Sequence, residues 1–217
     1  MGRLTPTSYA ILGLLSIRPW STYELTRQMR RSVGHVWPRA ESNLYREPER
    51  LVEAGLAAAE VQMVGRRRRT QYSITTAGRD ALADWMHEPA GPTEIESETL
   101  LKVLFGDAVP REVLEGHLER FAAEAEAGGA TWRQIAGEYL AGDGPFPERI
   151  HVNVLYWVLL DRWARLRADW ARWAIAEVEA WPDERGPQDR NESLRLLRRA
   201  LDGEPGLLAE RRARPED

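Results

Sequence analysis

Residues 41–76 read ESNLYREPERLVEAGLAAAEVQMVGRRRRTQYSITT and carry the most informative pattern in the chain. In its first part, apolar side chains such as Leu51 recur at helical spacing, and Gly55 is a typical residue for the end of a helix. Two runs in which apolar residues occupy every second position then flank the polar segment 65–69. This pattern is typical of two short strands joined by a turn. We therefore expect a helix over residues 41–54, followed by a β-hairpin.

Two further helices are expected before this stretch and one after it. Thr5 is a favourable N-cap and a proline follows it, which predicts a helix over residues 5–17. Ser21 and Glu24 have the spacing of a capping box, so a second helix is expected to begin there. The helix after the hairpin is expected to end at Trp85. Three helices, a hairpin and a helix, in this order, indicate a winged helix-turn-helix.

The rest of the chain is predicted to be helical, so the fold class is mainly α with a small β-hairpin. Pro89, Gly91 and Pro92 indicate a linker between the two parts. The helical patterns beyond it cover about residues 96–105, 111–139, 149–181 and 192–201. We expect a winged helix-turn-helix DNA-binding domain over residues 1–88, a linker over 89–98, a helical dimerisation domain over 99–181, and a polar tail over 182–217 that is partly helical or disordered.

The composition excludes several classes of protein. The 217 residues include no cysteine, which excludes a disulfide framework, a thiol nucleophile and any cysteine-ligated metal. No apolar run approaches the roughly 20 residues that a membrane helix needs. The four histidines are far apart, and no glycine-rich phosphate loop follows a strand. We expect a cytoplasmic protein with no catalytic residues, no metal, no cofactor and no membrane partner.

Charge is distributed unevenly along the chain. The first 90 residues carry 13 arginines against 9 acidic residues, whereas the remainder carries 17 basic and 25 acidic residues. Four of these arginines, Arg66–Arg69, are adjacent at the expected hairpin turn, where they repel one another unless an anion neutralises them. DNA phosphates are such anions, so the hairpin is predicted to bind DNA. A solvated, charged turn is the alternative.

The helix that begins at residue 41 provides a second set of candidate contacts. In helix-turn-helix proteins, the N-terminal residues of the recognition helix point into the major groove. Ser42, Asn43 and Arg46 can bind base edges or phosphates there, and the Tyr45 hydroxyl can reach a phosphate. The alternatives are that Ser42 caps the helix and that Tyr45 packs against the first helix. Pro48 lies inside the helical pattern and predicts a kink or an irregular first turn.

A tryptophan-rich segment marks the second half of the chain. Five of its large apolar residues are spaced 4, 3, 4 and 3 apart, as in a coiled coil, and Trp157 lies on a flanking face. These residues are expected to form core and dimer interface, or an aromatic-lined pocket that suits flat or cationic ligands. The full set is Trp157, Leu159, Trp163, Leu166, Trp170 and Trp173.

Motifs in a fixed order over about residues 5–85 carry a family resemblance. They are Tyr9–Leu15 (YAILGLL), Tyr23–Leu25 (YEL), Ser42–Tyr45 (SNLY), Leu51–Leu56 (LVEAGL), Gly65–Arg68 (GRRR), Tyr72–Thr75 (YSIT) and Gly78–Arg79 (GR). Together they resemble PadR-type transcriptional regulators. From Glu98–Lys102 (ETLLK) onward, the chain is similar to the helical C-terminal domain of the longer, virulence-activator-like members.

The resemblance implies a homodimer that binds an inverted-repeat operator in double-stranded DNA, commonly as a repressor. It also implies that the C-terminal helices join the two copies, and that some members sense small aromatic or cationic compounds at that interface. By position, the contacts that it implies are Ser42, Asn43, Tyr45 and Arg46 in the recognition helix, and Arg66, Arg67, Arg68 and Tyr72 in the wing. The rival hypothesis is a winged-helix scaffold that binds proteins and has no DNA-binding role.

Overall fold

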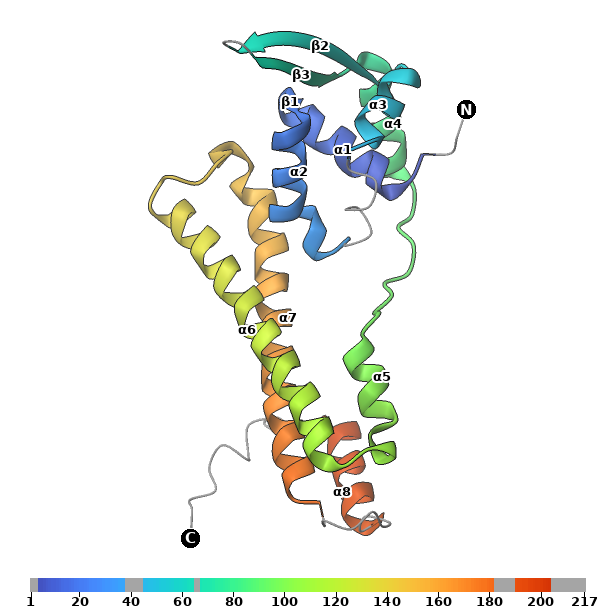
Figure 1. Ribbon diagram of the computed structural model, residues 1–217, viewed down its shortest axis with the longest axis vertical. Helices are drawn as coiled ribbons and strands as arrows, with labels where there is room; N and C mark the ends of the chain where they lie inside the picture. Colours follow the sequence, from blue (N-terminus) through green and yellow to red (C-terminus); the bar gives the residue numbers. More distant parts are fainter. Residues whose placement is uncertain (1–3, 38–44, 65–66, 182–189, 204–217) are drawn as a thin grey trace. The chain divides into compact units, whose positions relative to one another are not determined.

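The computed structural model describes residues 4–37, 45–64, 67–181 and 190–203 (Figure 1). The chain folds into two compact units, Met1–Thr93 and Glu94–Asp217. The described part is mainly helical, with a small antiparallel sheet in the first unit, which confirms the predicted fold class. None of the described helices is both long enough and apolar enough to cross a membrane.

The first unit contains helices and strands in the order that the sequence predicts. Thr5 caps the first helix and forms a capping box with Ser8, and Ser21 forms one with Glu24 at the second helix. The capping signals therefore act as expected. The elements are α1 (Pro6–Ile17), β1 (Trp20–Ser21), α2 (Thr22–Arg31), η1 (Val33–His35), α3 (Glu47–Glu53), β2 (Ala57–Val64), β3 (Arg67–Ile74) and α4 (Thr76–His87).

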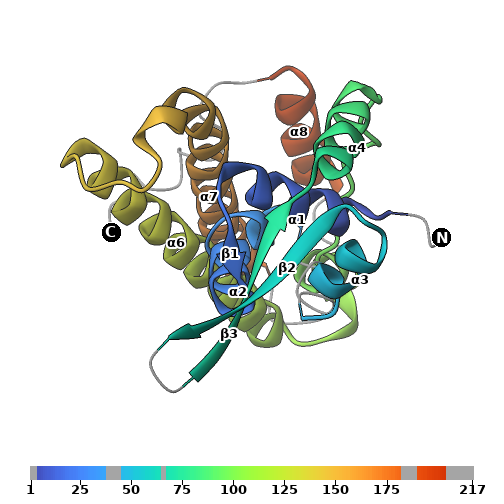
Figure 2. The same ribbon diagram turned by 90° about the horizontal axis from the view of Figure 1, so that it is seen from above.

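The sheet differs from the prediction in two respects. A two-residue strand, β1, joins the hairpin, and Trp20 is paired with Tyr72 in the strand order β1-β3-β2. The hairpin strands also extend further than expected, because Val64 pairs with Arg67. The expectation that residues 65–69 form the turn is therefore wrong for Arg67, Arg68 and Arg69, which belong to β3. Figure 2 shows the β2–β3 hairpin extending beyond the helices of its own unit.

The core of the first unit holds these elements in place. The Trp20 ring is buried, and its indole N–H donates to the backbone carbonyl of Leu14 at 2.7 Å. Tyr9 of α1 stacks on Trp85 of α4 with ring centroids 4.7 Å apart. Apolar side chains of the three helices and the sheet complete this core: Ile11, Leu12, Leu15, Leu25, Met29, Leu51, Ala57 and Tyr72.

The second unit is built on two long antiparallel helices (Figure 1). Leu114 and Leu118, near the start of α6, pack with Val178, near the end of α7, whereas Ile135 packs with Leu160. The predicted helical spans are confirmed here to within one or two residues at nearly every end. The elements are α5 (Glu98–Leu104), η3 (Gly106–Ala108), α6 (Arg111–Leu140), η4 (Pro147–Arg149), α7 (Ile150–Glu179) and α8 (Arg190–Leu201).

Candidate nucleic-acid interface

The start of α3 fixes the position of the predicted recognition segment, residues 42–46. The helix begins at Glu47, and Pro48 lies in its first turn, where a proline lacks no helical hydrogen bond. Pro48 therefore does not kink the described helix. Glu47 is 2% exposed; it accepts a hydrogen bond from the Ser8 hydroxyl of α1 and pairs with Arg50 at 2.7 Å. This buried carboxylate attaches the start of α3 to the first turn of α1.

Tyr45 and Arg46 lie in the turn just before α3, with both side chains exposed. Tyr45 is 64% exposed, so the alternative that it packs against the first helix is not what the structure shows. The Arg46 side chain has no hydrogen bond or ion pair to another described residue. Both side chains are thus available to a partner. The candidates Ser42 and Asn43 lie outside the described residues, as does the predicted helix start at residue 41.

The arginines of the wing, which is the β2–β3 hairpin, divide into two kinds. Arg69 forms an ion pair with Glu24 of α2 and donates to the Ser21 hydroxyl at 3.0 Å, so the fold neutralises its charge. Arg68, the preceding residue in β3, is exposed, and its side chain has no hydrogen bond or ion pair to another described residue. Successive residues of a strand point to opposite faces of the sheet, so Arg68 points away from the face of Arg69. Arg66 and the side chain of Arg67 lie outside the described residues.

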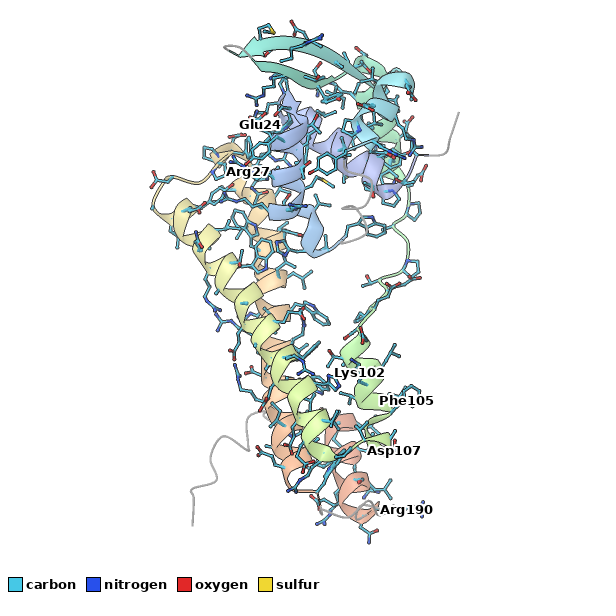
Figure 3. All side chains as sticks on the ribbon, in the orientation of Figure 1. Glu24, Arg27, Lys102, Phe105, Asp107 and Arg190 are labelled. Atoms are coloured by element: carbon cyan, nitrogen blue, oxygen red, sulfur yellow. The ribbon has the colours of Figure 1, made fainter. Side chains whose placement is uncertain are left out.

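Glu24 is the charged centre of this arrangement on α2 (Figure 3). Its partial burial would raise the pKa of its carboxyl, but hydrogen bonds from the Ser21 backbone N–H and from Arg69 outweigh that effect and lower the pKa to about 2. Arg18 adds a further cation at 3.5 Å. The carboxylate therefore stays ionised at any physiological pH and keeps the wing attached to α2.

We expect Glu24→Gln to destabilise the protein at neutral pH and to have little effect near pH 2. A carboxyl whose pKa falls from 4.5 to about 2 on folding stabilises the native state above pH 4.5, and this contribution disappears as the pH falls towards 2. Urea denaturation of wild type and variant at several pH values measures the difference. A difference in unfolding free energy that stays constant down to pH 2 would contradict this account.

The position of Tyr72 corrects one predicted contact. Its side chain is 4% exposed and belongs to the core, where the residue pairs with Trp20 across the sheet. A ring in this position supports the base of the wing and leaves no aromatic surface for a duplex. We therefore exclude Tyr72 from the candidate contacts.

A comparison with known protein families identifies this unit. Residues 11–84, which include α1 to α4 and the sheet, match the model of the transcriptional regulator PadR-like family. Residues 11–84 of this chain are thus a PadR-like domain. Because the PadR-like family is a family of transcriptional regulators, the match agrees with the expectation that the protein is not an enzyme.

Two curated relatives resemble the chain in part of their length. The negative transcriptional regulator PadR of Bacillus subtilis is 30% identical over 107 residues, which are 48% of this chain and 58% of that protein. The probable transcriptional regulator Rv1176c of Mycobacterium tuberculosis is 37% identical over 87 residues, 39% of this chain and 46% of that protein. The chain thus spans about half the length of these relatives.

Solved structures resemble the fold over a longer stretch than the PadR-like domain. The crystal structure of B. subtilis PadR with operator DNA has a TM-score of 0.67 and 21% identity, covering 79% of this chain and 98% of that one. The structure of the Vibrio cholerae virulence activator AphA has a TM-score of 0.60 and 26% identity, covering 80% of this chain and 98% of that one. The similarity therefore includes helices beyond the PadR-like domain.

The tryptophan-rich segment lies in α7, outside the PadR-like domain, and its residues divide into two groups. Trp157 packs against Tyr139 at 4.5 Å between ring centroids, and Trp170 packs edge-on against Phe121 at 5.6 Å. Trp173 also packs against the core between α6 and α7. Three other side chains of the set remain exposed: Leu159 (64%), Trp163 (40%) and Leu166 (50%).

The face of α7 that packs against α6 is not the predicted seam. It consists mostly of small side chains: Leu160, Ala164, Ala168, Ala171, Ala174 and Val178. The exposed residues Leu159, Trp163 and Leu166 follow one another at spacings of four and three on a separate face, and the exposed Val152 and Leu155 extend it towards the start of α7. This set of five residues, the α7 stripe, is a continuous apolar surface of the protomer.

A groove of about 400 Å³ lies between α6 and α7. Its arginines are paired with carboxylates: Arg172 pairs with Glu126 at 2.6 Å and with Asp169 at 2.7 Å, and both Arg133 and Arg165 pair with Asp161. None of the six predicted aromatic or apolar residues lines it, so it is not the predicted aromatic pocket. The lining residues are Ala125, Glu126, Gly129, Arg133, Ala164, Arg165, Ala168, Asp169 and Arg172.

Two features of the PadR-like domain were not anticipated from the sequence. The Glu24–Arg69 ion pair and the buried Glu47 both join elements that are far apart in the chain. Glu24 was predicted as a helix cap, but a cap says nothing about a cation in a distant strand. For Glu47, the available signal was the proline that follows it. Proline is favoured in the first turn of a helix, so Pro48 indicates that the helix starts close to Glu47.

Proposed function

We propose that this chain is a cytoplasmic, homodimeric regulator that binds an inverted-repeat operator in double-stranded DNA and represses transcription. The observation that carries the proposal is the division of the wing arginines. The fold neutralises Arg69, whereas the side chains of Arg68 and of Arg46, just before α3, are exposed and have no hydrogen bond or ion pair to a described residue. These two positions are the ones at which a winged helix-turn-helix approaches DNA.

The proposed contacts follow from this division. Arg46 can pair with a phosphate or a guanine, Tyr45 can donate to a phosphate, and Arg68 can contact the backbone or enter a minor groove. The crystal structure of B. subtilis PadR with operator DNA supports the same use of a similar fold. Four further residues remain proposed contacts from the sequence: Ser42, Asn43, Arg66 and Arg67.

The proposed dimer uses the α7 stripe. A run of exposed apolar residues along a helix is costly to leave in water, and a second copy of the same stripe would cover it with two-fold symmetry. Trp163 is suited to such an interface because its indole offers a large apolar area and one N–H donor. Such a dimer would present two recognition segments to successive major grooves, about 34 Å apart on DNA.

We further propose that a small aromatic compound releases the protein from DNA. B. subtilis PadR has been crystallised with p-coumaric acid, and its name records negative regulation. In this chain, the exposed Trp163 would offer a face for stacking. V. cholerae AphA is named an activator, so transcription from the bound promoter, with and without the protein, determines the direction of regulation.

We expect the affinity for DNA to fall steeply with salt, and Arg68→Gln to reduce that dependence. Each arginine that neutralises a phosphate contributes about 0.9 to the slope of log affinity against log salt concentration, so a dimer loses about two units. Fluorescence anisotropy with a labelled duplex from the region upstream of the protein's own gene measures the slope.

Arg69→Gln is the neighbouring comparison, because it removes the same charge from a residue that the fold already neutralises. Its slope should change less than that of Arg68→Gln. Wild-type protein that binds no duplex at low salt would refute the proposed function and favour the protein-binding scaffold. An unchanged slope for Arg68→Gln would refute the role of the wing.

A further inference from the structure

The first helix of the helix-turn-helix carries two exposed side chains that the proposed contacts leave unused. Tyr23 of α2 is 72% exposed, and Arg27 follows it after one turn and is also exposed. Neither side chain has a hydrogen bond or ion pair to another described residue. An aromatic hydroxyl and an arginine one turn apart are neighbours on the helix surface and can both donate to one anion.

The packing of α2 fixes the direction of this pair. Leu25 and Met29 are each 1% exposed and point into the core. At 3.6 residues per turn, Tyr23 and Arg27 lie on the side of the helix opposite to them. Because the capping box at Ser21 also sets the start of the helix, this outer face is presented in one orientation.

The same helix is attached to the wing. Glu24 follows Tyr23 directly and holds Arg69 of β3, and Ser21 accepts a hydrogen bond from Arg69. Figure 3 shows Glu24 and Arg27 along α2, with the sheet beyond the start of the helix. The outer face of α2 and the wing therefore keep a fixed geometry relative to each other within one unit.

We propose that Tyr23 and Arg27 form a phosphate-binding site on α2, which grips the sugar–phosphate backbone beside the groove that the recognition segment enters. The inference rests on the proposed function and adds a contact surface to it. In a helix-turn-helix, the helix before the recognition helix crosses the DNA backbone, where arginine and tyrosine bind phosphate oxygens. Arg27 supplies charge there, and the Tyr23 hydroxyl donates one neutral hydrogen bond.

The different chemistry of the two side chains gives a specific test. Arg27→Gln should reduce the salt slope of duplex binding by about two units for a dimer and weaken binding about equally on different sequences. Tyr23→Phe should weaken binding several-fold and leave the slope unchanged, because it removes a hydrogen bond and no charge. Anisotropy titrations of the full chain with the upstream duplex and with a scrambled duplex measure both effects.

Arg165→Gln is the charge-matched control. Arg165 lies on α7 and pairs with Asp161 at the surface, so its replacement changes the net charge equally but touches no proposed contact. Circular dichroism checks that the α2 variants fold. If Arg27→Gln and Arg165→Gln bind the duplex with the same affinity and the same salt slope, while Arg68→Gln has a reduced slope, the α2 site is refuted and the proposed function stands. If wild-type protein binds neither duplex, both are refuted.

Discussion

Replacing Gly78 by alanine is expected to destabilise the first unit by about 3 kcal/mol or more. A Cβ at this position would lie 2.0 Å from the carbonyl oxygen of Leu56 and 2.9 Å from a side-chain carbon of Ile74. The first of these is a backbone atom and cannot rotate away. Either α4 must shift from the sheet or the Leu56 carbonyl must lose its hydrogen bond from Thr75.

Gly13→Ala is the matched control for this substitution. Gly13 lies in the interior of α1, and a Cβ there meets no atom within 4 Å. Alanine is the better helix former, so this variant should be more stable by up to about 1 kcal/mol. Hydrogen exchange of the peptides from β2, β3 and α4 reports the result in the full chain. Equal protection in Gly78→Ala and wild type would mean that the close packing of α4 does not hold in solution.

The double variant Leu159→Glu, Leu166→Glu is expected to separate the proposed dimer and to reduce operator affinity by two or more orders of magnitude. The α7 stripe would then carry four carboxylates at a two-fold interface, and burying unpaired charges is prohibitive. A dimer binds its second half-site as an intramolecular step, and a monomer loses that advantage, typically a factor of 10² to 10⁴. Sedimentation velocity and duplex titration measure the two effects.

The control for this experiment lies on the same helix. Val154 and Val158 are 44% and 55% exposed, but they lie on another face, away from the α7 stripe. Val154→Glu, Val158→Glu adds the same charge to the same helix, with its two carboxylates one turn apart instead of two, and should leave both the dimer and DNA binding intact. Equal behaviour of the two double variants would show that the α7 stripe is not the interface.

The helices could be predicted from the sequence because their ends carry local signals. The hydroxyls of Thr5 and Ser21 cap α1 and α2 within three residues of their own position. Gly55 adopts the left-handed conformation with φ of +73° that ends α3, as expected for a glycine there. Such signals require nothing from the rest of the fold, and the predicted order of elements followed from them.

The parts that could not be predicted depend on distant partners. Strand β1 has two residues and exists because β3 supplies its hydrogen bonds. Glu47 is buried because Ser8, 39 residues away, donates to it. Of the wing arginines, the sequence could not single out Arg69 as neutralised, since its ion-pair partner Glu24 lies in a distant helix.

The choice of faces on α7 also escaped the sequence, for a different reason. Large apolar residues dominate the predicted seam, and hydrophobicity alone ranks them above alanine for burial. However, α6 and α7 meet through Ala164, Ala168, Ala171 and Ala174, and small side chains let two helices approach closely. Size complementarity between two helices is not visible in the pattern of either one.

This alanine-lined contact also has a mechanical consequence. Where the four alanines of α7 meet α6, the two helices pack closely and have little freedom to slide, and Arg167–Glu124 and Arg172–Glu126 link them further. A push at one end of the pair should reach the other as a rigid-body tilt. Bending is then expected in residues 88–97, which form no helix or strand, so substitutions that stiffen this segment should alter the response to an effector more than its binding.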